Sequence, residues 1–161
     1  MIRPARTSDA AAIATIYNHY ILKTIVTFEE NTVSVAEISE RISEIFANEL
    51  PMFVWEDDEV VLGYTYANKW KSRCAYRYAL EATIYLDPTA TGRGIGTQLY
   101  TALIAEIRKT KIHAIIAGVA LPNGGSVALH EKLGFKKMGQ FKEVGWKFER
   151  WIDVGYWELI L

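Results

Sequence analysis

Three glycines fall within five positions, at 92, 94 and 96, in the stretch YLDPTATGRGIGTQLY (residues 85–100). A run rich in aromatic and β-branched residues over 76–86 predicts a strand before them, and apolar residues at helical spacing over 99–107 predict a helix after them. A glycine-rich turn from a strand into a helix exposes main-chain N–H groups at the positive end of the helix dipole, so it can hold a phosphate. The rest of the fold must be built around this unit.

The spacing of these glycines excludes two common nucleotide-binding motifs. The pattern GxGxxG fails because Thr97 stands at its last position, and GxxxxGK[ST] does not occur. The loop therefore indicates a different phosphorylated ligand. A tight strand-to-helix turn with no ligand stays open as the alternative.

Length and charge narrow the class of protein. A chain of 161 residues fits one domain, 1–161, and its 18 basic and 19 acidic residues nearly balance. We therefore expect neither nucleic acid nor a membrane surface as a partner. The longest apolar run, 114–121, is far below the roughly 20 residues of a membrane span. The N-terminus lacks a signal-peptide pattern and Cys74 is the only cysteine, so we expect a cytoplasmic protein.

Hydrophobic periodicity predicts helices and strands that alternate only in part. Ser8 and Asp9 are expected caps of a first helix, and Ser34 and Glu37 form a capping box before a second. That second helix is expected to bury a face made of Ile38, Ile42, Ile45 and Phe46. The expected strands are 2–4, 52–57, 60–70, 76–86 and 113–121 plus an aromatic tail, and the expected helices end near 23, 50, 107 and 134. These elements favour an α/β fold with a mixed sheet and helices on both faces.

The glycine loop resembles the acyl-CoA loop of the GCN5-related N-acetyltransferases (GNAT). Gly94 and Gly96 match the end of its pattern, Gln or Arg, two residues, Gly, one residue, Gly or Ala, while Thr91 departs from its start. The segments IYNHYI, TFE, WKSRCAYRYALEATIYL, LPNGGSVALHEKLGF and GWKFERWIDVGYWE are similar, in order, to phosphinothricin and methionine sulfoximine N-acetyltransferases. The resemblance implies a GNAT fold with a mostly antiparallel twisted sheet, acetyl-CoA as donor, a small glutamate-like amino acid analogue as acceptor, and a homodimer.

Two residues are candidates for proton transfer. The amine must lose a proton before it attacks a thioester, and Glu81 lies among apolar neighbours that would raise the pKa of its carboxyl. A solvent-facing strand residue is the alternative. The resemblance implies a catalytic role for Glu81 and for His130. Without the resemblance, a lone histidine on a helix is more often a polar surface residue or a satisfied core residue. Whether His130 acts as acid or base stays open.

The resemblance also implies how the coenzyme is bound. The main chain of one strand would pair with the pantetheine arm as an added strand does, and the glycine loop would hold the pyrophosphate. Asn123 is equally natural as a turn and cap residue, and Lys132 as a solvated helix charge. The expected coenzyme-binding residues are Ile84, Tyr85, Leu86, Gly92, Arg93, Gly94, Ile95, Gly96, Thr97, Asn123 and Lys132.

The sequence gives fewer signals for the residues that would bind the acceptor. Lys71 and Arg73 precede the Glu81 strand and could bind an anionic group, and Phe28 could wall the pocket, although surface charge and core packing would explain them as well. Thr83 is a further candidate for substrate contact beside Glu81. No metal is expected, because the three histidines are scattered without ligand spacing. The aromatic tail is expected to pack in the core and in a dimer.

Two other functions stay open from the sequence. The chemistry could serve another amine, such as a polyamine or a protein N-terminus. The chain could also be a non-catalytic acyl-CoA-binding module, but such a module has no use for Glu81 and His130.

Overall fold

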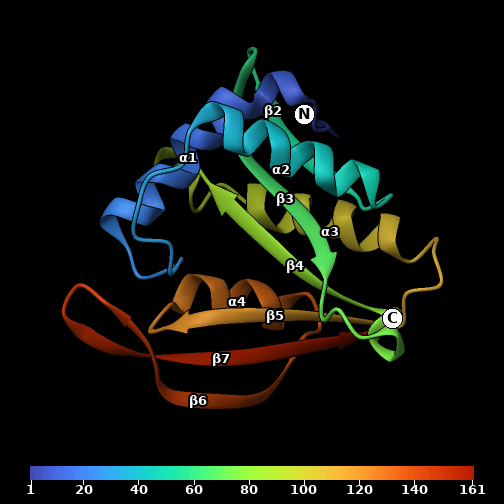
Figure 1. Cartoon of the computed structure of the whole chain (residues 1–161). Helices are drawn as coiled ribbons and strands as arrows, with labels where there is room; N and C mark the ends of the chain where they lie inside the picture. The colour runs from blue at the N-terminus through green and yellow to red at the C-terminus, as the bar shows by residue number, and fades with distance from the viewer.

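The computed structural model describes residues 1–161 and contains one seven-stranded sheet in the order β1-β2-β3-β4-β5-β7-β6 (Figure 1). All neighbouring strands are antiparallel except β4 and β5, which are parallel. The strands are β1 (Ile2–Pro4), β2 (Met52–Asp57), β3 (Val60–Lys69), β4 (Ala79–Leu86), β5 (Ala114–Leu121), β6 (Lys136–Lys147) and β7 (Arg150–Ile160). The helices are α1 (Ala10–Lys23), α2 (Val35–Ala47), α3 (Ile95–Ile107) and α4 (Gly124–Lys132). The predicted α/β class with a mixed sheet is confirmed.

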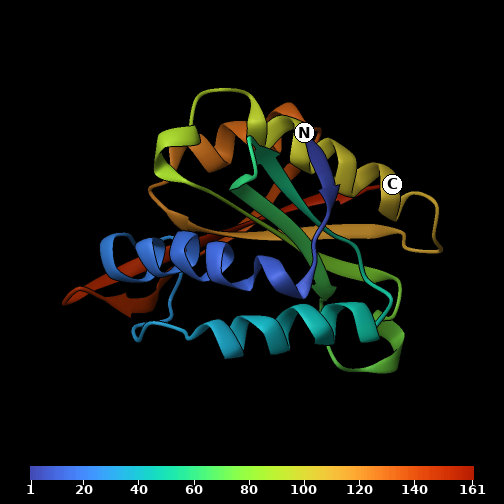
Figure 2. The same cartoon turned by 90° about the horizontal axis from the view of Figure 1, so that it is seen from above.

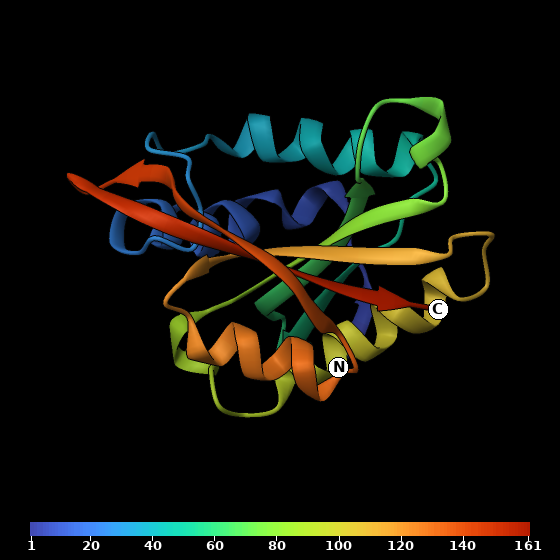
Figure 3. The same cartoon turned by 90° about the horizontal axis from the view of Figure 1, so that it is seen from below.

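The helices cover both faces of the sheet, as the sequence predicts. Helices α1 and α2 lie on one face and α3 and α4 on the other (Figures 2 and 3). Each layer has its own core: Ile13, Ile42 and Val54 belong to the first, and Leu103 and Trp157 to the second. The sheet therefore carries two separate apolar layers, which explains why both the helices and the central strands are rich in apolar residues.

Most local signals are confirmed, with two corrections. The Ser34–Glu37 capping box forms, with both reciprocal bonds present. Asp9 does not cap α1, because its carboxylate instead binds the Arg3 guanidinium and the Arg6 N–H, each at 2.8 Å. Phe46 is 39% exposed, since it lies at the edge of the α2 face that the three isoleucines bury.

The parallel pair β4–β5 splits apart along its length. Pairing covers only Ala79–Glu81 against Ala114–Ile116, although the strands continue to Leu86 and Leu121. The last pair is Glu81 with Ile116, and the two strands diverge toward their C-terminal ends (Figure 1). The split leaves main-chain groups of β4 without a strand partner and opens the middle of the molecule.

The hairpin β6–β7 carries most of the aromatic tail. Trp157 is buried in the second core, as expected, but Trp146 and Trp151 are 50% and 60% exposed and contact each other at 4.8 Å between ring centroids. No helix of the protein is long and apolar enough to cross a membrane.

Candidate active site

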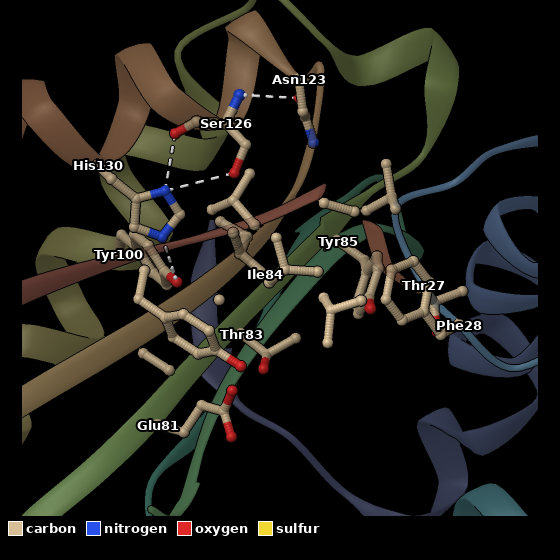
Figure 4. Close-up of a pocket in the computed structure, with 18 residues that line it drawn as sticks. Thr27, Phe28, Glu81, Thr83, Ile84, Tyr85, Tyr100, Asn123, Ser126 and His130 are labelled. Atoms are coloured by element: carbon tan, nitrogen blue, oxygen red, sulfur yellow. Dashed lines mark hydrogen bonds between the residues drawn. The ribbon is translucent and has the colours of Figure 1, made fainter. Parts of the chain in front are cut away.

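A cavity of about 430 Å³ lies where β4 and β5 diverge (Figure 4). We call it the acceptor cavity. Strands β4 and β5, helices α3 and α4, and the loop between α1 and α2 all contribute to its wall. All the candidate catalytic and acceptor-binding residues except Lys71 and Arg73 lie together here: Phe28, Glu81, Thr83 and His130.

Glu81 presents a carboxyl suited to accept a proton. The residue is half-buried, its carboxylate points into the cavity below Thr83 in Figure 4, and it has no ion-pair partner. Burial raises the pKa of the Glu81 carboxyl, and the positive charge of Lys71 opposes this only in part. A raised pKa makes the Glu81 carboxylate a stronger base than an ordinary surface carboxylate.

His130 is held in one tautomer by two hydrogen bonds. Its Nδ1 lies 2.7 Å from the carbonyl oxygen of Ser126, which can only accept, so Nδ1 carries the hydrogen. Nε2 is then the acceptor and receives a hydrogen bond from the Tyr100 hydroxyl at 3.0 Å. Burial lowers the pKa of the imidazole, so His130 is neutral at pH 7.

Tyr100 is the site residue that the sequence reasoning missed. It lies on the buried face of α3, 1% exposed, yet its hydroxyl reaches the acceptor cavity and His130. Burial raises the pKa of the phenol, so it stays protonated. The only signal in the sequence is a tyrosine among the apolar residues of a buried helix face, and that pattern alone more often marks core packing.

A second hollow, about 410 Å³, runs from the glycine loop along α4, and we call it the coenzyme groove. It shares Val26, Ile84, Asn123 and Ser126 with the acceptor cavity, so the two spaces adjoin. Gly92 and Gly94 have φ of +74° and +78°, a region that residues with a Cβ enter only with strain, and no atom lies within 4 Å of a Cβ built on either. The loop is therefore bare backbone that faces open space at the start of α3.

The three expected contacts on β4 differ in which side of the strand their main-chain groups face. Asp87 donates its N–H to Leu62 in β3, and because alternate residues of an antiparallel strand face the same partner, Tyr85 also pairs with β3. Ile84 and Leu86 then direct their main-chain groups into the gap. The Leu86 carbonyl already accepts from the Tyr20 hydroxyl at 2.7 Å. The expected main-chain contact therefore remains available to Ile84 and to the N–H of Leu86, whereas Tyr85 is occupied in the ladder and buries its side chain.

The remaining coenzyme candidates lie as follows. Thr97 and Lys132 line the groove, and Asn123 lines it while its side chain also caps α4 by accepting from the Ser126 N–H at 3.1 Å. Arg93 is exposed and lies 3.4 Å from Asp57. Ile95 offers no side chain to the groove, because it is buried beside Leu99. Gly96 lines the groove with its main chain, and a Cβ built on it would lie 3.4 Å from Leu86 and 3.5 Å from Leu129.

The two expected cations lie elsewhere. Lys71 and Arg73 are exposed in the segment before β4 and do not line the acceptor cavity. Only Lys71 acts on the site, through its charge on Glu81. The cavity wall itself contains no lysine or arginine.

Comparison with known proteins decides the family. The model of the acetyltransferase (GNAT) domain family matches residues 2–155. The chain belongs to the GNAT acetyltransferase family. It is 37% identical to the L-methionine sulfoximine/L-methionine sulfone acetyltransferase of Salmonella typhimurium, over 99% of this chain and 94% of that protein.

Two solved structures of related acetyltransferases have the same fold as this chain. A phosphinothricin acetyltransferase from Sinorhizobium meliloti in complex with acetyl-CoA is 36% identical, with a TM-score of 0.97 over 100% of this chain and 88% of that one. A ribosomal-protein-alanine N-acetyltransferase from Brucella melitensis is 33% identical, with a TM-score of 0.98 over 100% of this chain and 99% of that one. The predicted family, the GNAT fold and an acetyl-CoA-dependent N-acetyltransferase activity are therefore confirmed.

Proposed function

We propose that this acetyltransferase transfers the acetyl group of acetyl-CoA to the α-amino group of a small glutamate-like amino acid analogue, such as phosphinothricin or methionine sulfoximine. The observation that carries the proposal is the junction of the coenzyme groove with the acceptor cavity, where Glu81 and the Tyr100–His130 pair line one space. The names of the Salmonella and Sinorhizobium relatives support the acceptor class.

The residues of the groove fit acetyl-CoA, which supplies an activated acetyl thioester. The glycine loop would hold the pyrophosphate on main-chain N–H groups and Ile84 would pair with the amide-bearing arm. Asn123 lies where the groove meets the cavity, and Thr97 and Lys132 line the groove. Holding the amine and the thioester together would itself supply much of the rate, because the two reactants no longer have to meet by chance.

Two groups of the chain are assigned to proton transfer: Glu81 and the Tyr100–His130 pair. Glu81 takes the proton of the acceptor's ammonium group, directly or through one water. As the amine attacks, Tyr100 accepts the second N–H proton while it passes its own proton to Nε2 of His130. The same pair then returns this second proton to the leaving thiolate. Starting from the ammonium, two N–H bonds are therefore lost: one proton forms the S–H bond of coenzyme A, and the other leaves Glu81 for the solvent.

The acceptor's acidic groups need a cation that the cavity wall lacks. We assign this role to Lys71, because its charge already acts on Glu81, and leave Arg73 without one. Phe28 and Thr83 would contact the rest of the acceptor, since both line the cavity.

We further propose that the chain forms a homodimer through the hairpin β6–β7. Exposed large apolar side chains gather on this hairpin, each at least 50% exposed, and a patch of this kind on a folded protein marks an interaction site. They are Met138, Phe141, Val144, Trp146, Phe148 and Trp151. The exposed, unpaired Cys74 supports a reducing compartment such as the cytoplasm.

A protein N-terminus is the second candidate acceptor, and the Brucella neighbour favours it. The test is to mix the protein with acetyl-CoA and, separately, with phosphinothricin, methionine sulfoximine, a polyamine and a peptide that begins with alanine. Mass spectrometry should find acetylation of the first two at the highest kcat/KM. Acetylation confined to the peptide or the polyamine would overturn the proposed acceptor.

A further inference from the structure

Gly118 lies in the middle of β5, directly beside the Glu81 carboxylate in the wall of the acceptor cavity. A Cβ built on Gly118 would lie 3.7 Å from Oε1 of Glu81 and 3.3 Å from Cε1 of Tyr156. Gly118 is exposed although its neighbours Ala117 and Val119 are buried, so the open side of its backbone is cavity surface.

The backbone does not explain a glycine at this position. Its φ is not among the positive values, so any residue could adopt the same conformation. A glycine inside a strand weakens the strand and often marks close approach of a ligand or another backbone. The three atoms nearest to the missing Cβ belong to the side chains of Tyr156 and Glu81, and none of them is a backbone atom.

We infer that Gly118 is a specificity-determining residue: its bare main chain is the floor beside Glu81 on which the acceptor's α-carbon and its substituents sit. This inference rests on the proposed function, in which the cavity holds the acceptor amine. The missing side chain leaves Oε1 of Glu81 open on the side that faces β5, so an acceptor can approach the carboxylate there. A residue with a Cβ would place a methyl group 3.7 Å from Oε1, in tight contact with the Tyr156 ring, and would block this approach.

A methyl group at this position would also change the surroundings of the base. The charged or titratable groups around Glu81 are Lys71, Tyr66, Tyr100 and, across the same cavity, His130 and Tyr156. Burial keeps Tyr66 and Tyr100 neutral by raising the pKa of each phenol, and His130 is neutral, so Lys71 is the charge that acts on Glu81. An apolar group beside Oε1 would add desolvation and raise the pKa of Glu81 further.

The experiment compares Gly118→Ala and Gly118→Val with Gly139→Ala. Gly139 is also a strand glycine, in β6, but nothing lies within 4 Å of its missing Cβ. For each variant, kcat/KM for the preferred acceptor is measured from pH 5 to pH 9, and the Kd of acetyl-CoA by calorimetry. Both substitutions replace glycine by residues with a higher strand propensity, and circular dichroism checks the fold.

Gly118→Ala should lower kcat/KM by about tenfold or more, since one methyl group in a fitted site changes it by about 10- to 200-fold. Gly118→Val should lower kcat/KM further. In the pH profile of kcat/KM for Gly118→Ala, the acid limb should move to higher pH. The Kd of acetyl-CoA should stay within twofold of the parent value, and Gly139→Ala should match the parent throughout.

Equal kcat/KM and equal acid limbs for Gly118→Ala and Gly139→Ala would overturn the inference while the proposed function stands. Absence of acetylated acceptor with the parent protein would instead remove the proposed function. The two failures are therefore distinguishable.

Discussion

At neutral pH, the Glu81 carboxylate should lower the free energy of unfolding, although the activity requires it. Its folded pKa is raised above the unfolded value, so between these two values the folded state binds more protons than the unfolded state. The free energy of unfolding should therefore fall as pH rises through that window. Glu81→Gln should flatten this part of the curve and raise stability at pH 7, as urea unfolding at pH 4, 5, 6 and 7 would measure.

The same substitution should remove most of the activity. We expect kcat to fall by about 100-fold or more, the usual contribution of a general base, with the Kd of acetyl-CoA unchanged. A Glu81→Gln enzyme that turns over at the parent rate would contradict the assignment of Glu81 as base.

Tyr100 and His130 should act as one unit. Tyr100→Phe keeps the buried ring but removes the hydroxyl that donates to Nε2, which leaves that nitrogen without its partner at a cost of about 1–3 kcal/mol in stability. We expect kcat to fall by about tenfold or more, and the double variant with His130→Gln to lose little beyond either single variant. Tyr76→Phe is the matched control, because Tyr76 is exposed and lies outside the cavity. Fully multiplicative losses in the double variant would show two independent residues.

At the scale of elements, the glycine loop should be required for coenzyme affinity more than for folding. Gly94→Ala would place a Cβ at φ +78°, which costs about 1–2 kcal/mol and distorts the N-terminus of α3. The free loop should relax out of this strained conformation, and binding the pyrophosphate must restore it. The Kd of acetyl-CoA should therefore rise by about tenfold, since 1.4 kcal/mol corresponds to that factor. Gly124→Ala, at the start of α4 in open space, should leave the Kd unchanged. Equal Kd values for the two variants would argue against the loop as the pyrophosphate site.

At the scale of the whole molecule, the hairpin β6–β7 should hold two copies together. Replacing Trp146 and Trp151 by lysine removes two exposed aromatic rings that contact each other and adds charge in their place. Sedimentation should find the parent as a dimer and this variant as a monomer, with Phe46→Lys on α2 as the control that stays dimeric. A monomeric parent would contradict the proposed homodimer.

The sequence by itself determined the elements and the glycine loop. Helix caps, turn glycines and hydrophobic periodicity are local properties, so the Ser34 capping box and the positive φ of Gly94 follow from a few neighbouring residues. Glu81 could be singled out for a similar reason, because its apolar neighbours along the strand already predict a desolvated carboxyl.

Only the tertiary structure decided which of these elements meet. The split between β4 and β5, the hydrogen bond from Tyr100 on α3 to His130 on α4, and the bare backbone of Gly118 beside Glu81 each join residues distant in the chain. A sequence pattern states which face of an element is buried but not which side chain of another element lies against it. The sequence also shows that Lys71 and Arg73 are charged, but only the tertiary structure shows that they lie outside the cavity.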